Sequence, residues 1–216
     1  MFALKKGCLY VVATPIGNLA DLSARARDVL AQVDLICAED TRHTRQMLNA
    51  IGLEKSMLAL HDHNEDERIA QILSQLRDGK SLALVSDAGT PLISDPGYRL
   101  VRELRAAGVD ISPIPGPCAA IAALSVAGIA SDRFSFEGFL PHKASARRER
   151  LQGLANESRT LVFYESSHRI EECLADMQAA FGAEREAVLA REITKLFETI
   201  LDGSLQAIAQ KVGADP

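Results

Sequence analysis

The sequence lacks a long apolar run, and this absence excludes the simplest membrane proteins. Hydrophobic residues make up 47% of the 216 positions, yet no apolar stretch approaches the roughly 18 continuous residues that a membrane-spanning helix requires. Residues 1–7 contain two lysines and no apolar region before a cleavage site, so no signal peptide is expected. We therefore expect a cytoplasmic protein that has no membrane partner.

Cysteine is scarce, and its spacing excludes the usual metal and disulfide frameworks. No two of the four cysteines have metal-ligand spacing, and each lies in an apolar context. They are Cys8, Cys37, Cys118 and Cys173. This pattern predicts reduced core cysteines of a cytosolic protein. His61 and His63 flank Asp62 and could ligate zinc, but no third or fourth ligand lies nearby in the sequence. We predict no metal site.

Phosphate-binding glycine motifs are also absent. The chain has neither a Walker A motif nor G-x-G-x-x-G. The loop predicted after the first strand contains one glycine and cannot cradle a diphosphate in the Rossmann manner. A cofactor without phosphates therefore fits this loop better than a nucleotide cofactor does. The net charge of −5 argues against a generally basic nucleic-acid-binding surface, although it is compatible with a local basic patch.

The first half of the chain contains a regular alternation of short apolar runs and amphipathic segments. The apolar runs predict strands over residues 9–13, 35–38, 57–60, 82–85 and 111–114. The helical periodicities predict helices over residues 21–30, 41–50, 64–77 and 97–107. Asn64 is the expected N-cap of the third of these helices. This alternation is typical of a parallel sheet with helices on both faces.

A proline-rich break at residues 113–117 interrupts the alternation and marks a domain boundary. We predict one α/β domain over residues 1–115 and a second over 116–216. The helix expected over 118–126 is apolar nearly all round, so it should be buried between domains or in a subunit interface. Short strands at 134–136, 161–164, 188–190 and 196–201, with helices at 144–155, 167–180 and 205–212, predict a mixed sheet.

Five polar clusters follow predicted strands. They lie at residues 14–21, 39–45, 61–64 and 86–97, and in the paired segments 164–169 and 191–195. Parallel strands would bring the first four to the carboxyl edge of one sheet, where ligands of open α/β sheets bind. Each cluster alone is explained by helix capping. Their coincidence favours a ligand cleft.

These clusters form an ordered set of motifs that resembles one family. The motifs occupy residues 13–19, 39–44, 86–97, 115–120, 137–141, 163–166 and 191–195. Over residues 9–203 the chain resembles the bacterial small-subunit ribosomal RNA cytidine 2′-O-ribose methyltransferases, a branch of the tetrapyrrole methylase (class III) superfamily. Thr14-Pro15 replaces the glycine-rich first loop of the tetrapyrrole C-methylases, and Gly89-Thr90-Pro91 replaces their Gly-Asp-Pro.

The resemblance implies two α/β domains, with a mainly parallel N-terminal sheet, a mixed C-terminal sheet and a ligand cleft between them, in a homodimer. It implies S-adenosylmethionine as the cofactor and a cytidine in the decoding centre of small-subunit (16S) ribosomal RNA as the substrate. Similar proteins continue past residue 216 with another strand and a tail, so the C-terminal domain is expected to be truncated. The alternatives are a tetrapyrrole or small-molecule methyltransferase and a non-catalytic ribosome-assembly factor.

The resemblance also implies a donor site, which the polar loops extend. The predicted donor-binding residues are Ile16, Asp87, Gly89, Thr90, Ile93, Ser94, Gly116, Cys118, Ala119 and Tyr164. Transfer to a hydroxyl requires an acceptor for its proton, and Asp40 and Glu165 are favoured among the carboxylates. Lys195 could act as a buried base or stabilise a developing alkoxide.

Two basic segments are candidates for RNA contact. The first contains Arg42, His43 and Arg45 at a predicted helix start. The second is a denser run with one acid, and it contains Lys143, Arg147, Arg148 and Arg150. The competing interpretation of the second run is a solvated helix face.

Overall fold

The computed structural model describes residues 3–61 and 65–214, and the chain divides into the units Met1–Cys118 and Ala119–Pro216. The predicted boundary after residue 115 lies just before this division. None of the helices within the described ranges is long and apolar enough to cross a membrane.

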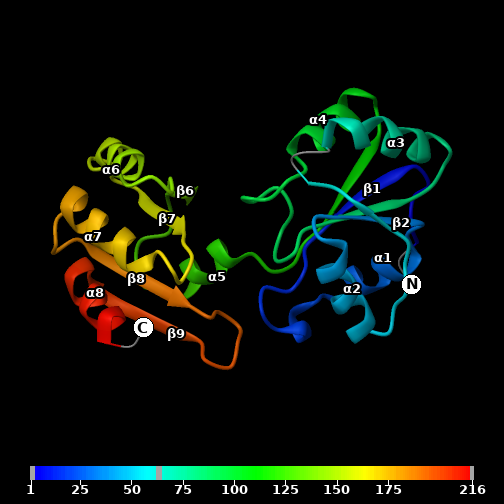
Figure 1. Ribbon diagram of the computed structural model, residues 1–216. Helices are drawn as coiled ribbons and strands as arrows, with labels where there is room; N and C mark the ends of the chain where they lie inside the picture. The colour runs from blue at the N-terminus through cyan, green and yellow to red at the C-terminus, as the bar shows by residue number, and fades with distance from the viewer. Residues whose placement is uncertain (1–2, 62–64, 215–216) are drawn as a thin grey trace. The chain divides into compact units, whose positions relative to one another are not determined.

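The first unit is built on a parallel sheet (Figure 1). Its strands follow the order β3-β2-β4-β1-β5. They are β1 (Cys8–Val12), β2 (Leu35–Ala38), β3 (Met57–Ala59), β4 (Leu82–Val85) and β5 (Asp110–Ile114). The connecting helices are η1 (Leu19–Asp21), α1 (Ala24–Gln32), α2 (Thr41–Ala50), α3 (Glu65–Arg77) and α4 (Tyr98–Ala106). The predicted parallel sheet is confirmed.

Burial on both faces explains why the strands read as continuous apolar runs. Every residue of β4 is buried. Leu82 and Leu84 pack into a cluster with residues of α3 and α4. Ala83 and Val85 pack into a second cluster with residues of α1 and α2. Because side chains alternate along a strand, these two clusters lie on opposite faces of the sheet.

The helix predicted over residues 21–30 starts later than expected. A 3-10 turn over Leu19–Asp21 comes first, and α1 begins at Ala24. The Ser23 side chain accepts a hydrogen bond from the Ala26 N–H and caps the helix. The predicted cap Asn64 lies outside the described residues.

The second unit contains a parallel strand pair and an antiparallel strand pair, which form two separate two-stranded sheets. Its strands are β6 (Phe134–Phe139), β7 (Thr160–Tyr164), β8 (Glu186–Arg191) and β9 (Thr199–Ser204). Strand β6 pairs with β7 in parallel, and β8 pairs with β9 antiparallel. Its helices are α5 (Ala119–Val126), α6 (Ala144–Gly153), α7 (Ile170–Phe181) and α8 (Leu205–Ala214).

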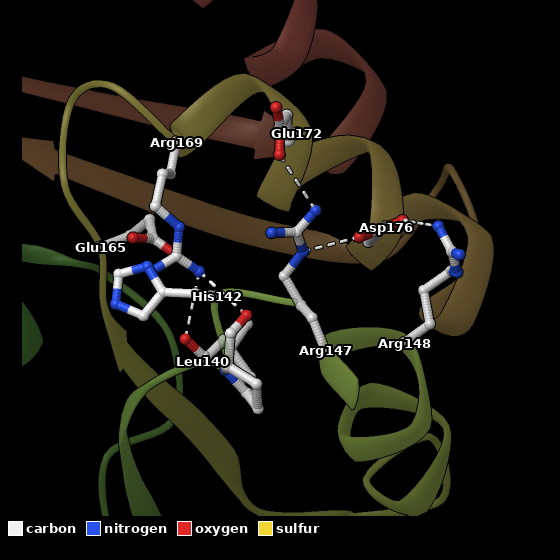
Figure 2. A network of polar contacts seen from close by, with 9 residues as sticks. Leu140, His142, Arg147, Arg148, Glu165, Arg169, Glu172 and Asp176 are labelled. Carbon is white, nitrogen blue, oxygen red and sulfur yellow. Dashed lines mark hydrogen bonds and ion pairs between the residues drawn. The ribbon is translucent and has the colours of Figure 1, made fainter. Parts of the chain in front are cut away.

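Arg147 of α6 is buried and ties this helix to α7 (Figure 2). Its side chain is 3% exposed. The guanidinium donates to Asp176 at 2.6 Å and to Glu172 at 3.3 Å. Arg148 lies 3.5 Å from the other Asp176 oxygen. The hydrogen bond to Asp176 raises the pKa of Arg147, so the guanidinium stays charged.

The burial of Arg147 argues against the prediction that its guanidinium contacts RNA. A guanidinium that is buried against two carboxylates is not available to a phosphate. The sequence run alone could not reveal this, since Asp176 lies on another helix. Arg150 is also paired, with Glu137 of β6, but more than half of its side chain is exposed. Lys143, at the N-cap position of α6, is exposed.

The Arg147 network generates a stability prediction. Replacing Arg147 with Met leaves Asp176, whose side chain is 12% exposed, without its closer partner, so the free energy of unfolding should fall by about 3 kcal/mol. The matched change Arg148→Met removes an exposed guanidinium from the same helix and should cost less than about 1 kcal/mol. Urea unfolding of both variants checks this difference. Equal losses of unfolding free energy in the two variants would contradict the conclusion that Arg147 is the structurally important partner of Asp176.

Candidate active site

The candidate site lies at the carboxyl ends of β1 and β4, where the sheet has its topological switch point. These strands are neighbours. The connection after β1 leads to α1 on one face, and the connection after β4 leads to α4 on the other. Neighbouring strands with diverging connections leave a crevice in which α/β proteins bind ligands.

Backbone hydrogen bonds join the two loops at this point. The Thr14 N–H donates to the Gly89 carbonyl at 2.8 Å, and the Gly89 N–H donates to the Thr14 carbonyl at 3.1 Å. The buried Thr14 hydroxyl also donates to the Ser86 carbonyl at 3.2 Å. Gly89 has a φ of 81°, which favours glycine. A Cβ on Gly89 would lie 3.3 Å from the Ile16 side chain.

The turn after β5 packs against the same two loops. The Thr90 hydroxyl donates to the Pro117 carbonyl at 3.0 Å. A Cβ on Gly116 would lie 3.0 Å from the Ala13 Cβ, so this close approach requires glycine or a shift of the backbone. Loops from three neighbouring strands are therefore held together by short polar side chains and by glycine.

The loop after β2 joins this edge through a carboxylate. Asp87 accepts a hydrogen bond from the Asp40 N–H at 3.1 Å. The four strand-end loops predicted to converge include those after β1, β2 and β4, and the structure brings these three together. The fourth contains His61, which is described, while Asp62, His63 and Asn64 lie outside the described residues.

The 86–97 loop is strained and partly exposed. Leu92 and Ser94 adopt positive φ values of 73° and 66°, which non-glycine residues rarely do. Ile93 between them is 38% exposed. Burial raises the pKa of Asp95, and the nearby Asp87 raises it further, against a hydrogen bond from Ser86. Strain of this kind often accompanies ligand-binding loops.

Asp40 is engaged in capping, which disfavours the role of proton acceptor predicted for it. Its carboxylate accepts from the Arg42 N–H at 2.8 Å and pairs with the Arg42 guanidinium at 2.9 Å. These hydrogen bonds lower its pKa to about 2. A carboxylate with such a pKa is a weak base at neutral pH. His43 and Arg45 are exposed on the first turn of α2.

Tyr164 and Glu165, predicted to serve the site, lie at the end of β7 in the second unit. The Tyr164 hydroxyl accepts from the Ala120 N–H at 3.0 Å, and so caps the start of α5. The Glu165 side chain is 6% exposed and lies 3.3 Å from the Arg169 guanidinium. Arg169 also donates to the carbonyls of Leu140 and Pro141 (Figure 2). Glu165 is therefore a fixed, buried carboxylate.

Lys195 lacks the burial that a lysine base requires. It lies between β8 and β9, its side chain is 46% exposed, and it pairs with Glu192 at 2.9 Å. Its position is still compatible with the other role predicted for it, stabilisation of the negative charge on a developing alkoxide.

The cysteines have no disulfide partners, as predicted. Cys8, Cys37 and Cys173 are buried, and Cys118 is half-buried at the end of the first unit. Burial raises the pKa of Cys37 and of Cys173 to about 12, which makes both thiols inert at neutral pH. Within the described residues, no group of three or more His, Cys, Asp or Glu side chains is arranged to hold a metal.

Sequence reasoning missed two residues that organise these segments. Thr14 was part of a polar cluster, but its role as the clamp between two loops depends on Gly89, 75 positions away. Arg169 holds the turn between β6 and α6, and the sequence signal for it was only its i,i+4 spacing from Glu165.

Comparisons with known proteins agree with this architecture. The family model for Tetrapyrrole (Corrin/Porphyrin) Methylases matches residues 8–209. A solved cobalt precorrin-4 methyltransferase of cobalamin biosynthesis is 18% identical, with a TM-score of 0.69 over 97% of this chain and 90% of that chain. At this identity the likeness shows the fold alone.

Curated relatives are much more similar in sequence. The chain is 62% identical over 209 residues to a protein of Xylella fastidiosa named ribosomal RNA small subunit methyltransferase I. That match covers 97% of this chain and 77% of the relative. A Pasteurella multocida protein of the same name is 57% identical, with 97% and 75% covered. On these matches, the chain belongs to the tetrapyrrole methylase family.

Proposed function

We propose that this protein transfers the methyl group of S-adenosylmethionine to the 2′-hydroxyl of a cytidine in the decoding centre of small-subunit ribosomal RNA. The observation that carries the proposal is the identity of 55–62% to several curated proteins named ribosomal RNA small subunit methyltransferase I. The nucleotide and the 2′-oxygen follow from the resemblance of the motif set. The rival, tetrapyrrole methylation, is supported by the description of the family model and by a likeness in fold to solved structures that are 18% and 20% identical.

The loops of the first unit fit a donor of this chemistry. S-adenosylmethionine has no phosphates, and this edge has no phosphate-binding glycine motif. It offers closely packed backbone around Thr14, Gly89 and Gly116. It also offers the carboxylates of Asp87 and Asp95, whose negative potential favours a sulfonium cation. When bound, the donor supplies an electrophilic methyl group.

The residues of this chain have two tasks in such a reaction. The 86–97 loop has to hold the methyl carbon in line with the attacking oxygen, and the clamp between Thr14 and Gly89 supplies the rigidity for this. A carboxylate has to accept the hydroxyl proton. We favour Glu165, since Asp40 is held in a cap with a pKa of about 2. From the resemblance, we also propose that the donor contacts Ile16, Ile93, Cys118, Ala119 and Tyr164.

The first turn of α2 is the surface that we propose for RNA. Arg42 is 88% exposed at its side chain, and His43 and Arg45 are exposed beside it. The Asp40–Asp87 hydrogen bond joins this turn to the 86–97 loop. RNA phosphates bound there would lie near the proposed donor loops. A second candidate is the basic run that contains Lys143, Arg148 and Arg150, in which both arginines are less exposed than Arg42.

The proposal includes a homodimer. Helix α5 was expected to be buried between domains or in a subunit interface, and in the single chain Ile121 is 53% exposed and Val126 is 56% exposed. An exposed apolar helix face of this kind is typical of an interaction surface, and a second copy of the chain would bury it in a dimer interface.

The proposed reaction predicts an alkali-resistant product. Small ribosomal subunits that lack the modification should accept labelled methyl from S-adenosylmethionine when this protein is added. After alkaline hydrolysis, the label should remain in a dinucleotide, because a 2′-O-methyl group removes the hydroxyl that attacks the neighbouring phosphate. Label in a mononucleotide would indicate base methylation. Transfer to a porphyrinoid and not to the subunit would favour the tetrapyrrole alternative.

The α2 surface predicts a change in salt dependence. The double change Arg42→Gln and Arg45→Gln should weaken subunit binding about tenfold and reduce the slope of log affinity against log salt by about one to two. The control pair Arg148→Gln and Arg150→Gln removes two cations whose side chains are 56% and 55% exposed, against 88% for Arg42, so its effect should be smaller. Filter binding over a salt series measures both. An unchanged slope in the α2 variant would show that its arginines do not contact phosphates.

A further inference from the structure

Glu65, the first residue of α3, is a buried carboxylate to which the proposed reaction gives no task. The residue is 3% exposed, and glutamate is rarely buried to this extent unless it is paired. Its Oε1 accepts a hydrogen bond from the Leu100 N–H of α4 at 2.6 Å. Leu100 is itself fully buried. A buried, charge-assisted hydrogen bond therefore joins two helices through residues that lie 35 positions apart.

Helix α4 needs a capping group from elsewhere because its N-cap residue is Gly97, which has no side chain. The first N–H groups of a helix have no partner within the helix. In α4 the Val101 N–H donates to the Gly97 carbonyl. Leu100, the third helical residue, is at a position that capping side chains usually serve. Glu65 supplies this cap from α3, and its negative charge is favourable at a helix N-terminus.

The first turn of α4 also determines where the 86–97 loop ends. A Cβ on Gly97 would lie 2.9 Å from the Leu84 side chain and 3.3 Å from the Leu92 side chain. Leu84, Leu92 and Leu100 pack in one apolar cluster with residues of α3. The end of the loop is therefore packed closely against β4, and a displacement of the first turn of α4 would shift Leu92 as well.

The loop consequently has two fixed ends. The hydrogen bonds between Thr14 and Gly89 hold its start, and the Glu65 cap holds its end. Between them, the Ile93 N–H donates to the Thr90 carbonyl at 3.3 Å, which is long for such a bond. The strained backbone on either side of Ile93 persists only where the surrounding structure holds it. The middle of the loop therefore depends on both ends.

We propose that Glu65 is a positioning residue for donor binding. By capping α4 it fixes the end of the 86–97 loop, and so it places Ile93 and Ser94, which are predicted to contact S-adenosylmethionine. The inference rests on the proposed function, because that function assigns the donor to this loop.

Calorimetric titration with S-adenosylmethionine tests this role. Glu65→Ala should bind the donor about tenfold more weakly than the parent, because an uncapped α4 no longer fixes the loop. Glu65→Gln keeps an oxygen that can accept from the Leu100 N–H, so it should bind within about threefold of the parent. Asp66→Ala is the matched control: it removes an ion pair with Arg99 that also joins α3 to α4, but both side chains are exposed. Its donor affinity should equal that of the parent.

Amide hydrogen exchange of the donor-free protein shows whether the loop itself responds. In Glu65→Ala, exchange should become faster at Leu100, which loses its acceptor, and at Ile93 in the middle of the loop. Exchange at Gly89, whose N–H donates to the Thr14 carbonyl at the other end, should change little. Acceleration by the same factor at all three amides would indicate a global loss of stability and would overturn the proposal.

Two binding results would also overturn it. Parent-like donor affinity in Glu65→Ala, despite faster exchange at Leu100, would show that Glu65 only caps the helix. Equally weak binding by the alanine and glutamine variants would show that the hydrogen bond does not place the loop.

Two further outcomes are distinguished by the same measurements. If the alanine variant does not fold, Glu65→Asp takes its place, because its carboxylate is one methylene shorter and should likewise weaken donor binding. If the parent does not bind S-adenosylmethionine, the proposed function fails, and exchange at Ile93 decides whether Glu65 positions the loop.

Discussion

The candidate site depends on the reciprocal backbone hydrogen bonds between Thr14 and Gly89. They connect the ends of β1 and β4, the two strands from which the chain diverges to opposite faces of the sheet. Without this connection, the loop after β4 would have no support from the loop after β1 for the strained backbone conformations of Leu92 and Ser94. Glycine at position 89 allows the φ of 81° that the pairing needs. Thr90 and Gly116 then join the turn after β5 to the same point.

Much of the first unit could be predicted from the sequence, because its strands are buried on both faces and its helices are amphipathic. The apolar run of β4 and the capped start of α2 are local signals, and their bounds were predicted closely. The parallel order followed from the alternation of these signals. The expected meeting of polar loops at one edge followed from the same topology and is seen for the loops after β1, β2 and β4.

What the sequence could not reveal is which polar groups pair with one another across the fold. Arg147 reads as one cation in a basic run, but its partner Asp176 lies 29 positions away on α7. Asp40 reads as a catalytic carboxylate, but the structure engages it as the cap of α2. Side chains that can serve either a ligand or the fold look alike in a sequence. Donor, catalytic and RNA-contact roles of individual residues therefore stay predictions.

The most direct test of the account is donor binding to a variant of Gly89. Calorimetry should show that Gly89→Val binds S-adenosylmethionine more weakly than the parent, by about tenfold or more, because its Cβ would crowd the Ile16 side chain at 3.3 Å and disturb the clamp. Gly79→Val is the matched control, since Gly79 has a similar φ of 83° but no atom within 4 Å of its Cβ position. The control should bind the donor as the parent does. Parent-like affinity in Gly89→Val would contradict the placement of the donor at this edge of the sheet.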